Sequence, residues 1–107
     1  MNKKEYIQYH KEMCDKMISI TEQKNADYTG SSDDPFANFR VCEQLGVCSV
    51  AQGFVVRMTD KLKRIISIAV QQNKVKVLSE TVEDTLLDLA NYCILLAGYL
   101  KSTFNKE

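Results

Sequence analysis

Residues 81–103 carry the clearest pattern in the chain and constrain its fold the most. Apolar side chains recur there at intervals of three and four residues, which is the periodicity of a helix. They form two adjacent seams, Val82, Leu86, Leu89, Cys93, Leu96 and Leu100, then Leu87, Ala90, Ile94 and Ala97. At ~100° per residue the seams span an apolar arc of roughly 180°. Because one neighbouring helix cannot cover so wide an arc, we expect a small helical bundle that forms a homo-oligomer.

The first third of the chain predicts one helix and one loop. Residues 3–24 mix charged and apolar side chains with helical periodicity. Residues 24–36, KNADYTGSSDDPF, contain the only proline, a glycine and a cluster of serine and aspartate. These residue types interrupt helices and favour turns. We therefore expect the first helix to end near residue 24.

Two helices are expected between this loop and the last helix. A short helix over residues 36–45 would end at Gly46, which can act as its C-terminal cap. Ser49 can then cap a long helix that runs to about Gln72. The following segment, QQNKVKVL, alternates enough to leave a short strand open. Helices nevertheless dominate, so we predict an all-α, four-helix-bundle-like fold.

Length, charge and composition narrow the class of protein. The chain has 107 residues, which predicts one domain over residues 1–107. Its 14 basic and 14 acidic residues cancel, which disfavours dedicated DNA binding. The charged N-terminal segment and the absence of a long apolar run argue against a signal peptide and a membrane span. We therefore expect a cytoplasmic protein.

One face of the last predicted helix carries oxygen ligands. It holds Glu80, Asp84, Asp88 and Asn91, all within ~80° around the helix axis. Carboxylates one turn apart are close enough to share a hard cation such as Mg²⁺. Leu95 and Tyr99 continue this face, as the wall of a pocket would. The alternative is a solvated face whose acidic residues are favoured near a helix N-terminus.

The preceding helix carries a basic stripe. Arg57, Asp60, Arg64 and Ser67 share one face of this helix, and Lys61 lies at the edge of that face. Guanidinium groups match phosphate oxygens in pairs, so the three cations predict a phosphate clamp. Asp60 would then join the carboxylates of the facing helix around magnesium. The alternative is a salt-bridged surface, in which Asp60 pairs with an arginine one turn away. The face expected in the core holds Phe54, Met58, Leu62, Ile65 and Ala69.

The predicted loop and its flanks offer groups for recognising a base or a sugar. The candidates are Asn25, Asp27, Tyr28 and Asn38. Their amide, carboxylate and phenol groups can hydrogen-bond, and the tyrosine ring can stack on a base. The alternative is a turn stabilised by asparagine and aspartate side chains, with aromatic rings closing the end of the bundle.

Four segments occur together in a familiar order: KNADY, DPFANF, RMTDKLKRI and SETVEDTLLDLANYCILL. Over roughly residues 22–97 they resemble the nucleotide modification associated domain 1 family of phage and bacterial proteins. That family is in turn similar to the MazG-type all-α nucleoside triphosphate pyrophosphohydrolases. Those enzymes bind magnesium with carboxylates on two neighbouring helices and cut between the α- and β-phosphates.

The resemblance implies a set of metal ligands and catalytic residues. The metal ligands would be Asp60, Glu80, Asp84 and Asp88. Asp60 and Asp84 would be the catalytic pair. The chain departs from the MazG pattern, because its partner helix has one aspartate among several cations instead of a glutamate-rich motif. This departure suits holding phosphate better than hydrolysing it.

Three functions follow as hypotheses. The first is a small phage-type protein that binds a nucleotide or nucleotide-derived ligand, with Mg²⁺-dependent pyrophosphohydrolysis as its reaction if it is an enzyme. In this hypothesis Asn91 lies with the cations and the loop residues in the binding site. The second is a non-catalytic sponge that sequesters a nucleotide immune signal, as an anti-defence protein would. The third is an accessory subunit whose acidic face docks a partner protein.

Overall fold

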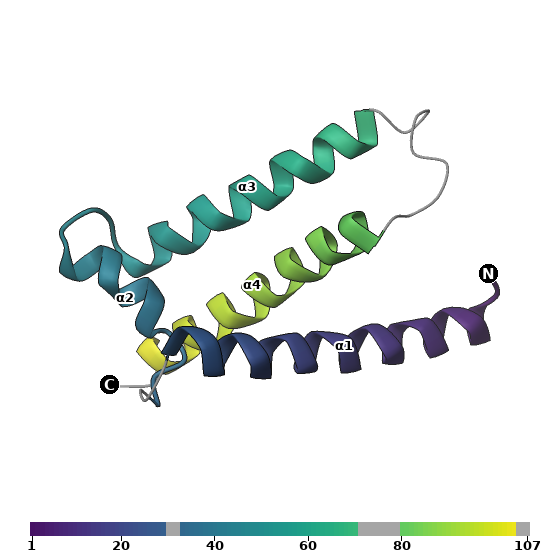
Figure 1. Ribbon diagram of the computed structural model, residues 1–107, viewed down its shortest axis with the longest axis horizontal. Coiled ribbons are helices and arrows are strands. Elements are labelled where there is room, and N and C mark those ends of the chain that lie inside the picture. The colour runs from purple at the N-terminus through teal and green to yellow at the C-terminus, as the bar shows by residue number, and fades with distance from the viewer. Residues whose placement is uncertain (30–32, 71–79, 105–107) are drawn as a thin grey trace. The chain divides into compact units, whose positions relative to one another are not determined.

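The computed structural model describes residues 1–29, 33–70 and 80–104. Of residues 25–29, 80 and 81 it describes only the helical backbone. The described part forms four helices, α1 (Lys3–Thr29), α2 (Ala37–Gln44), α3 (Val50–Val70) and α4 (Glu80–Phe104) (Figure 1). It contains no strand, which confirms the all-α prediction. The possible strand in QQNKVKVL falls outside the described residues.

Helix α1 continues beyond its expected end. The sequence predicts an end near residue 24, but the helix runs to Thr29. Residues 25–29 contain neither glycine nor proline, so nothing in that stretch interrupts helical hydrogen bonding before Gly30. The prediction of a loop is therefore wrong for its first part, which carries Asn25, Asp27 and Tyr28.

Contacts divide the chain into two compact units, Met1–Pro35 and Phe36–Glu107. The first unit contains α1, and the second contains α2, α3 and α4. The single domain expected over residues 1–107 stays a prediction. None of the helices in the described ranges is long and apolar enough to cross a membrane.

The corner between α2 and α3 forms as the sequence predicts. Gly46 adopts a φ of 73° and its N–H donates to the carbonyl of Glu43 at 3.0 Å. The N–H of Val47 donates to the carbonyl of Cys42 at 2.9 Å. These bonds satisfy the last carbonyls of α2, which confirms Gly46 as the residue that closes this helix.

The start of α3 is a reciprocal cap. The N–H of Gln52 donates to Oγ of Ser49 at 3.1 Å, and the N–H of Ser49 donates to Oε1 of Gln52 at 2.9 Å. Each side chain thereby satisfies a backbone donor that the first helical turn leaves without a partner. The predicted cap at Ser49 is confirmed.

We expect Gly46→Ala to lower the free energy of unfolding by about 1 kcal/mol. A Cβ at this position would meet no atom within 4 Å, so the cost comes from the left-handed backbone and not from a clash. Urea denaturation followed by circular dichroism measures it. Gly46→Asn is the matched control, because asparagine tolerates this conformation better and should lose less. Equal losses for both variants would contradict the conformational explanation.

Aromatic residues form the core of the Phe36–Glu107 unit. Phe39 from α2 and Phe54 from α3 stack with ring centroids 3.9 Å apart, and Val50 is buried beside them. Partly buried side chains pack around this cluster, namely Phe36, Met58, Tyr92, Leu95, Leu96 and Tyr99. The α4 members therefore tie that helix to α2 and α3. This packing explains why the acidic face of α4 turns apolar at Leu95, since that end of the face is core and not the wall of a pocket.

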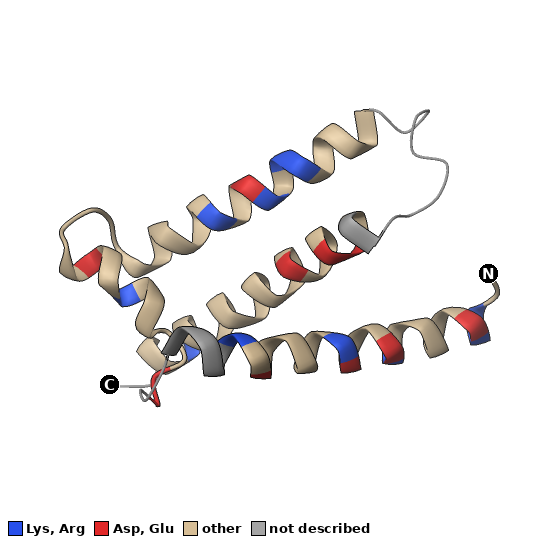
Figure 2. Ribbon diagram, viewed as in Figure 1, with Lys and Arg blue, Asp and Glu red and all other residues tan. Residues whose placement is uncertain are grey.

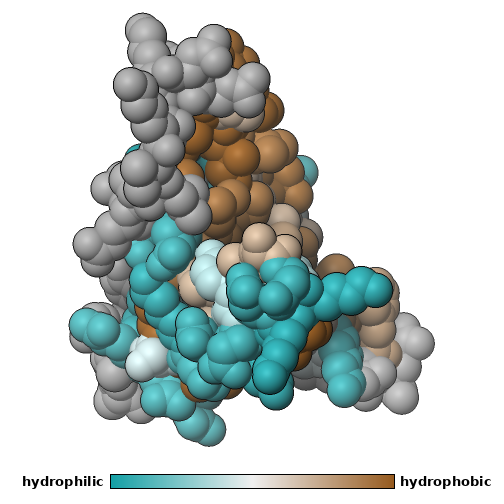
Figure 3. Space-filling model, turned by 90° about the vertical axis from the view of Figure 1, so that its right-hand side faces the viewer, coloured by the Kyte–Doolittle hydropathy of each residue, from teal (hydrophilic) through white to brown (hydrophobic). Residues whose placement is uncertain are grey.

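Much of the predicted apolar face stays exposed. Ile94 of α4 is 59% exposed and Leu62 of α3, which we expected in the core, is 49% exposed. Ala69 is also exposed. Part of that face is nevertheless buried, since Leu96 packs on the core beside Tyr92 and Tyr99 and Leu87 is only 5% exposed. Figure 3 shows apolar residues in brown over the upper part of that view, where α3 ends. Homo-oligomerisation stays a prediction.

Candidate functional site

An ion pair joins the two stripes that the sequence analysis singled out. Nζ of Lys61 on α3 lies 3.1 Å from Oδ2 of Asp88 on α4. The two side chains are only 20% and 21% exposed. At this degree of burial water screens the pair less than it would on the surface, so the contact orients both helices. The basic stripe of α3 and the acidic stripe of α4 therefore meet at this pair, through Lys61 and not through Asp60.

The neighbours of this pair fall on the same side of both helices. Arg57 and Arg64 lie one turn before and one turn after Lys61, rotated from it by only ~40–60° about the helix axis. Asp84 and Asn91 stand in the same relation to Asp88. Helices α3 and α4 run antiparallel (Figure 1), so the two stripes extend side by side. We name this surface the polar edge, consisting of Arg57, Lys61, Arg64, Asp84, Asp88 and Asn91.

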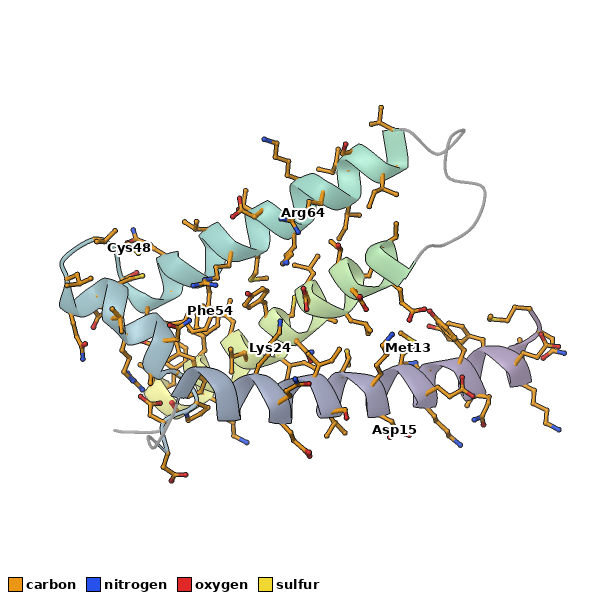
Figure 4. The ribbon with its side chains drawn as sticks, viewed as in Figure 1. Met13, Asp15, Lys24, Cys48, Phe54 and Arg64 are labelled. Carbon is orange, nitrogen blue, oxygen red and sulfur yellow. The ribbon has the colours of Figure 1, made fainter. Side chains whose placement is uncertain are left out.

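Figure 2 shows the basic residues, in blue, along the middle of α3 and the acidic residues, in red, in the first half of α4. The guanidinium of Arg57 lies 5.5 Å from the ring centroid of Phe39, so part of its position is set by the aromatic core. Arg64 lies between α3 and α4 in the view of Figure 4. Within the part of the chain that the structure describes, neither arginine forms an ion pair with a carboxylate.

Asp60 does not join the carboxylates of α4. It is exposed, and it precedes Lys61 by one residue, which rotates it by ~100° from the side chain that reaches Asp88. The salt bridge holds Asp88 with an ammonium group, where a metal site would need a free carboxylate. Among the described residues, no three carboxylate, histidine or cysteine side chains form a group that could hold a metal ion.

The remaining predicted metal ligands are Glu80, whose side chain lies outside the described residues, and Asp84 at the end of the polar edge. The described carboxylates, as arranged, do not fit a shared Mg²⁺ ion, because Lys61 neutralises Asp88 and Asp60 forms no metal-binding group with the carboxylates of α4. The magnesium set and the catalytic pair Asp60 and Asp84 stay predictions.

The predicted base-recognition residues are distributed over both units. Asn25, Asp27 and Tyr28 belong to the Met1–Pro35 unit, and their side chains are outside the described residues. Asn38 belongs to the second unit, where it is exposed on α2 next to the core residue Phe39. Of these four residues, only Asn38 lies in the same unit as the polar edge with its side chain described.

Sequence reasoning missed Arg40, which contacts two aromatic rings. Its guanidinium lies 5.8 Å from the ring centroids of both Phe36 and Tyr99. The two rings also contact one another edge to face, with centroids 5.6 Å apart. The spacing of four residues between Phe36 and Arg40 was a signal for this contact, because it places both on one side of a helix. Arg40 therefore packs against the part of α4 that lies in the core.

Comparison with known proteins gives one match. No curated protein and no solved structure matches the chain. A protein-family model described as nucleotide modification associated domain 1 matches residues 24–97. The matched segment contains α2, α3 and the whole polar edge, and the resemblance noted from the sequence motifs is confirmed over most of its length. The chain belongs to the nucleotide modification associated domain 1 family.

Proposed function

We propose that the polar edge binds the phosphates of a nucleotide or a nucleotide-derived ligand. The observation that carries this proposal is the Lys61–Asp88 ion pair flanked by two arginines that pair with no described carboxylate. The ion pair is neutral overall, so the two guanidinium groups leave this stretch of α3 with an excess of positive charge. Guanidinium groups bind phosphate oxygens through two parallel hydrogen bonds, which makes arginine well suited to this ligand.

The spacing of the arginines suits a ligand with more than one phosphate. Arg57 and Arg64 are seven residues apart, which is ~10 Å along a helix. Two long side chains at that separation can converge on one oligophosphate or hold two separate phosphates. Nearby amides can contact the base or sugar, since Asn91 lies one turn from Asp88 and Asn38 is exposed beside Phe39.

Binding without hydrolysis fits the arrangement of the carboxylates better than catalysis does. Hydrolysis between phosphates with Mg²⁺ needs several carboxylates free to hold the metal and to orient water. Here Lys61 holds Asp88, and Asp60 is exposed on α3 and belongs to no metal-binding group among the described residues. The proposed role is therefore capture of an intact nucleotide. In a phage-encoded protein such capture would serve to sequester a nucleotide signal of host defence.

One assay tests this proposal. Purified protein is incubated with Mg²⁺ and a panel of linear and cyclic nucleotides, and the free and heat-released fractions are analysed by mass spectrometry. We expect an intact nucleotide to be depleted from the free fraction and recovered on heating. Monophosphate and pyrophosphate in the free fraction would instead establish pyrophosphohydrolase activity. If every nucleotide stays free and intact, the proposed binding site is wrong.

Asp88→Asn should tighten nucleotide binding by about fivefold, or ~1 kcal/mol, measured by isothermal titration calorimetry. The substitution removes a negative charge from the polar edge and releases the Lys61 ammonium for phosphate. Glu43→Gln is the matched control, since it removes the same charge from an exposed position at the end of α2, outside the polar edge. Loss of affinity in Asp88→Asn would contradict this arrangement and favour a metal-binding role for the carboxylate.

A further inference from the structure

Cys42 and Cys48 meet at the corner between α2 and α3. Cys42 lies in the last turn of α2, and its carbonyl accepts the N–H of Val47 at 2.9 Å and the N–H of Cys48 at 3.5 Å. The chain reverses between them through Gly46, whose positive φ suits this turn. The turn therefore brings the two cysteines together at the corner, although six positions separate them in the sequence, and the Cys42 side chain is close enough to help raise the pKa of Cys48.

The surroundings hold the pair in place while leaving it accessible. Both cysteines are half-buried free thiols. A Cβ added at Gly53 would lie 3.8 Å from Sγ of Cys48, so this sulfur packs against the first turns of α3. Figure 4 labels Cys48 at this corner, between α2 and α3. The other cysteines lie elsewhere, Cys14 on α1 and Cys93 exposed on α4.

We propose that Cys42 and Cys48 form a reversible intramolecular disulfide when they react with a small-molecule disulfide such as oxidised glutathione. The thiolate of Cys42 attacks one sulfur of the oxidant, forming a mixed disulfide and releasing one glutathione thiolate. Cys48 then loses its proton to solvent and attacks the protein sulfur of the mixed disulfide, which releases the second glutathione. Two protein thiols are oxidised and one glutathione disulfide is reduced to two thiols, so atoms and electrons balance.

The order of the two attacks follows from the environment of Cys48. Burial, together with the neighbouring Cys42 thiol and the Glu43 carboxylate, raises the pKa of Cys48 above its usual value. A thiol with a raised pKa is protonated at neutral pH and is a slow nucleophile toward an external oxidant. Once the mixed disulfide is next to it, proximity compensates for the low thiolate fraction. Closure should therefore accelerate as the pH rises.

The disulfide would stabilise the corner on which the core depends. It would link the last turn of α2, which carries the stacked Phe39, to the segment that leads into α3, which carries Val50 and Phe54. Glu43 already supports this junction, because its Oε2 accepts the N–H of Val50 at 3.2 Å. The disulfide would add a covalent link to the hydrogen bonds that already hold this corner.

The sequence allows a direct test by peptide mapping. Trypsin cleaves after Arg40 and Arg57, so both cysteines fall in the single peptide 41–57. Native protein is incubated with oxidised glutathione, denatured in the presence of an alkylating agent and digested. We expect this peptide to be unalkylated and lighter by about 2 Da, the mass of the two hydrogen atoms lost in disulfide formation. A glutamate-specific protease then cuts after Glu43, and the two halves should stay joined.

Two variants separate this disulfide from other thiol chemistry. Cys48→Ser removes the second nucleophile, so glutathione should accumulate on Cys42 as the trapped mixed disulfide. Cys93→Ser is the matched control and should leave closure of the 41–57 peptide unchanged. The proposal is overturned if both cysteines of the wild-type peptide are alkylated, if glutathione remains attached to them, or if either is found bonded to Cys14 or Cys93.

Discussion

Replacing Phe54 by alanine is expected to lower the free energy of unfolding by about 3–5 kcal/mol. Phe54 is 0% exposed and stacks on Phe39 with ring centroids 3.9 Å apart. Tyr99 of α4 lies against it as well, with centroids 6.1 Å apart. Figure 4 shows Phe54 pointing from α3 toward the other helices of its unit. The substitution therefore leaves a cavity where α2, α3 and α4 meet, and it removes the contacts of all three helices at once.

The neighbouring residue provides the control. Val55 follows Phe54 on α3 but is 56% exposed, so Val55→Ala should change stability by less than ~0.5 kcal/mol. Both variants are measured by urea denaturation, with tyrosine fluorescence as the probe, because Tyr92 and Tyr99 pack against the affected core. A small loss for Phe54→Ala, or equal losses for the two variants, would show that the core is not centred on the phenylalanine pair.

The helix ends show which parts of this fold are encoded locally. Gly46 and Ser49 were identified correctly because each acts on backbone groups within a few residues. The residue type alone indicates that glycine can end a helix and that serine can cap the start of one. The end of α1 was misplaced because asparagine and aspartate in residues 24–36 were taken as turn formers. These residues only lower helix propensity by a fraction of a kcal/mol, whereas the glycine at position 30 is a stronger break.

The orientation of α4 could not be predicted from its own sequence. Leu96 of the first seam packs on the core beside Tyr92 and Tyr99, whereas Leu86 and Ile94 of the seams stay exposed. The choice is made by the neighbours, since the stacked Phe39 and Phe54 present a flat aromatic surface against which Tyr92 and Tyr99 pack. Local periodicity reveals that a helix has an apolar side but not which partner that side contacts.

The sequence predicts the two charged stripes of the candidate site, but not which of their residues contact one another. The spacing of Arg57, Lys61 and Arg64 places them together on any helix, and that part needs no tertiary information. The partner of Asp88 depends on the rotation of α3 about its axis. A rotation of one residue, ~100°, decides whether Lys61 or Asp60 faces α4, and the structure selects Lys61. The choice changes the expected chemistry from metal binding to phosphate binding.

Removing both arginines of the polar edge should reduce nucleotide affinity by about 100-fold, or ~2.7 kcal/mol. Arg57→Ala/Arg64→Ala deletes two charge-assisted contacts to phosphate, each contributing ~1.5–3 kcal/mol, and less than this sum is expected because both side chains are exposed and water screens their contacts. The measurement is isothermal titration calorimetry with the nucleotide that the depletion assay identifies. Unfolding curves of the double variant should stay close to wild type, since both side chains are exposed.

A second double variant distinguishes a defined site from general electrostatic attraction. Lys63→Ala/Lys101→Ala removes the same net charge from exposed positions outside the polar edge. If phosphate binds at the polar edge, this control keeps wild-type affinity within about twofold, because charges that far from the ligand are screened by salt. If both double variants lose affinity equally, the arginines of the polar edge have no special role and the proposed phosphate site is wrong.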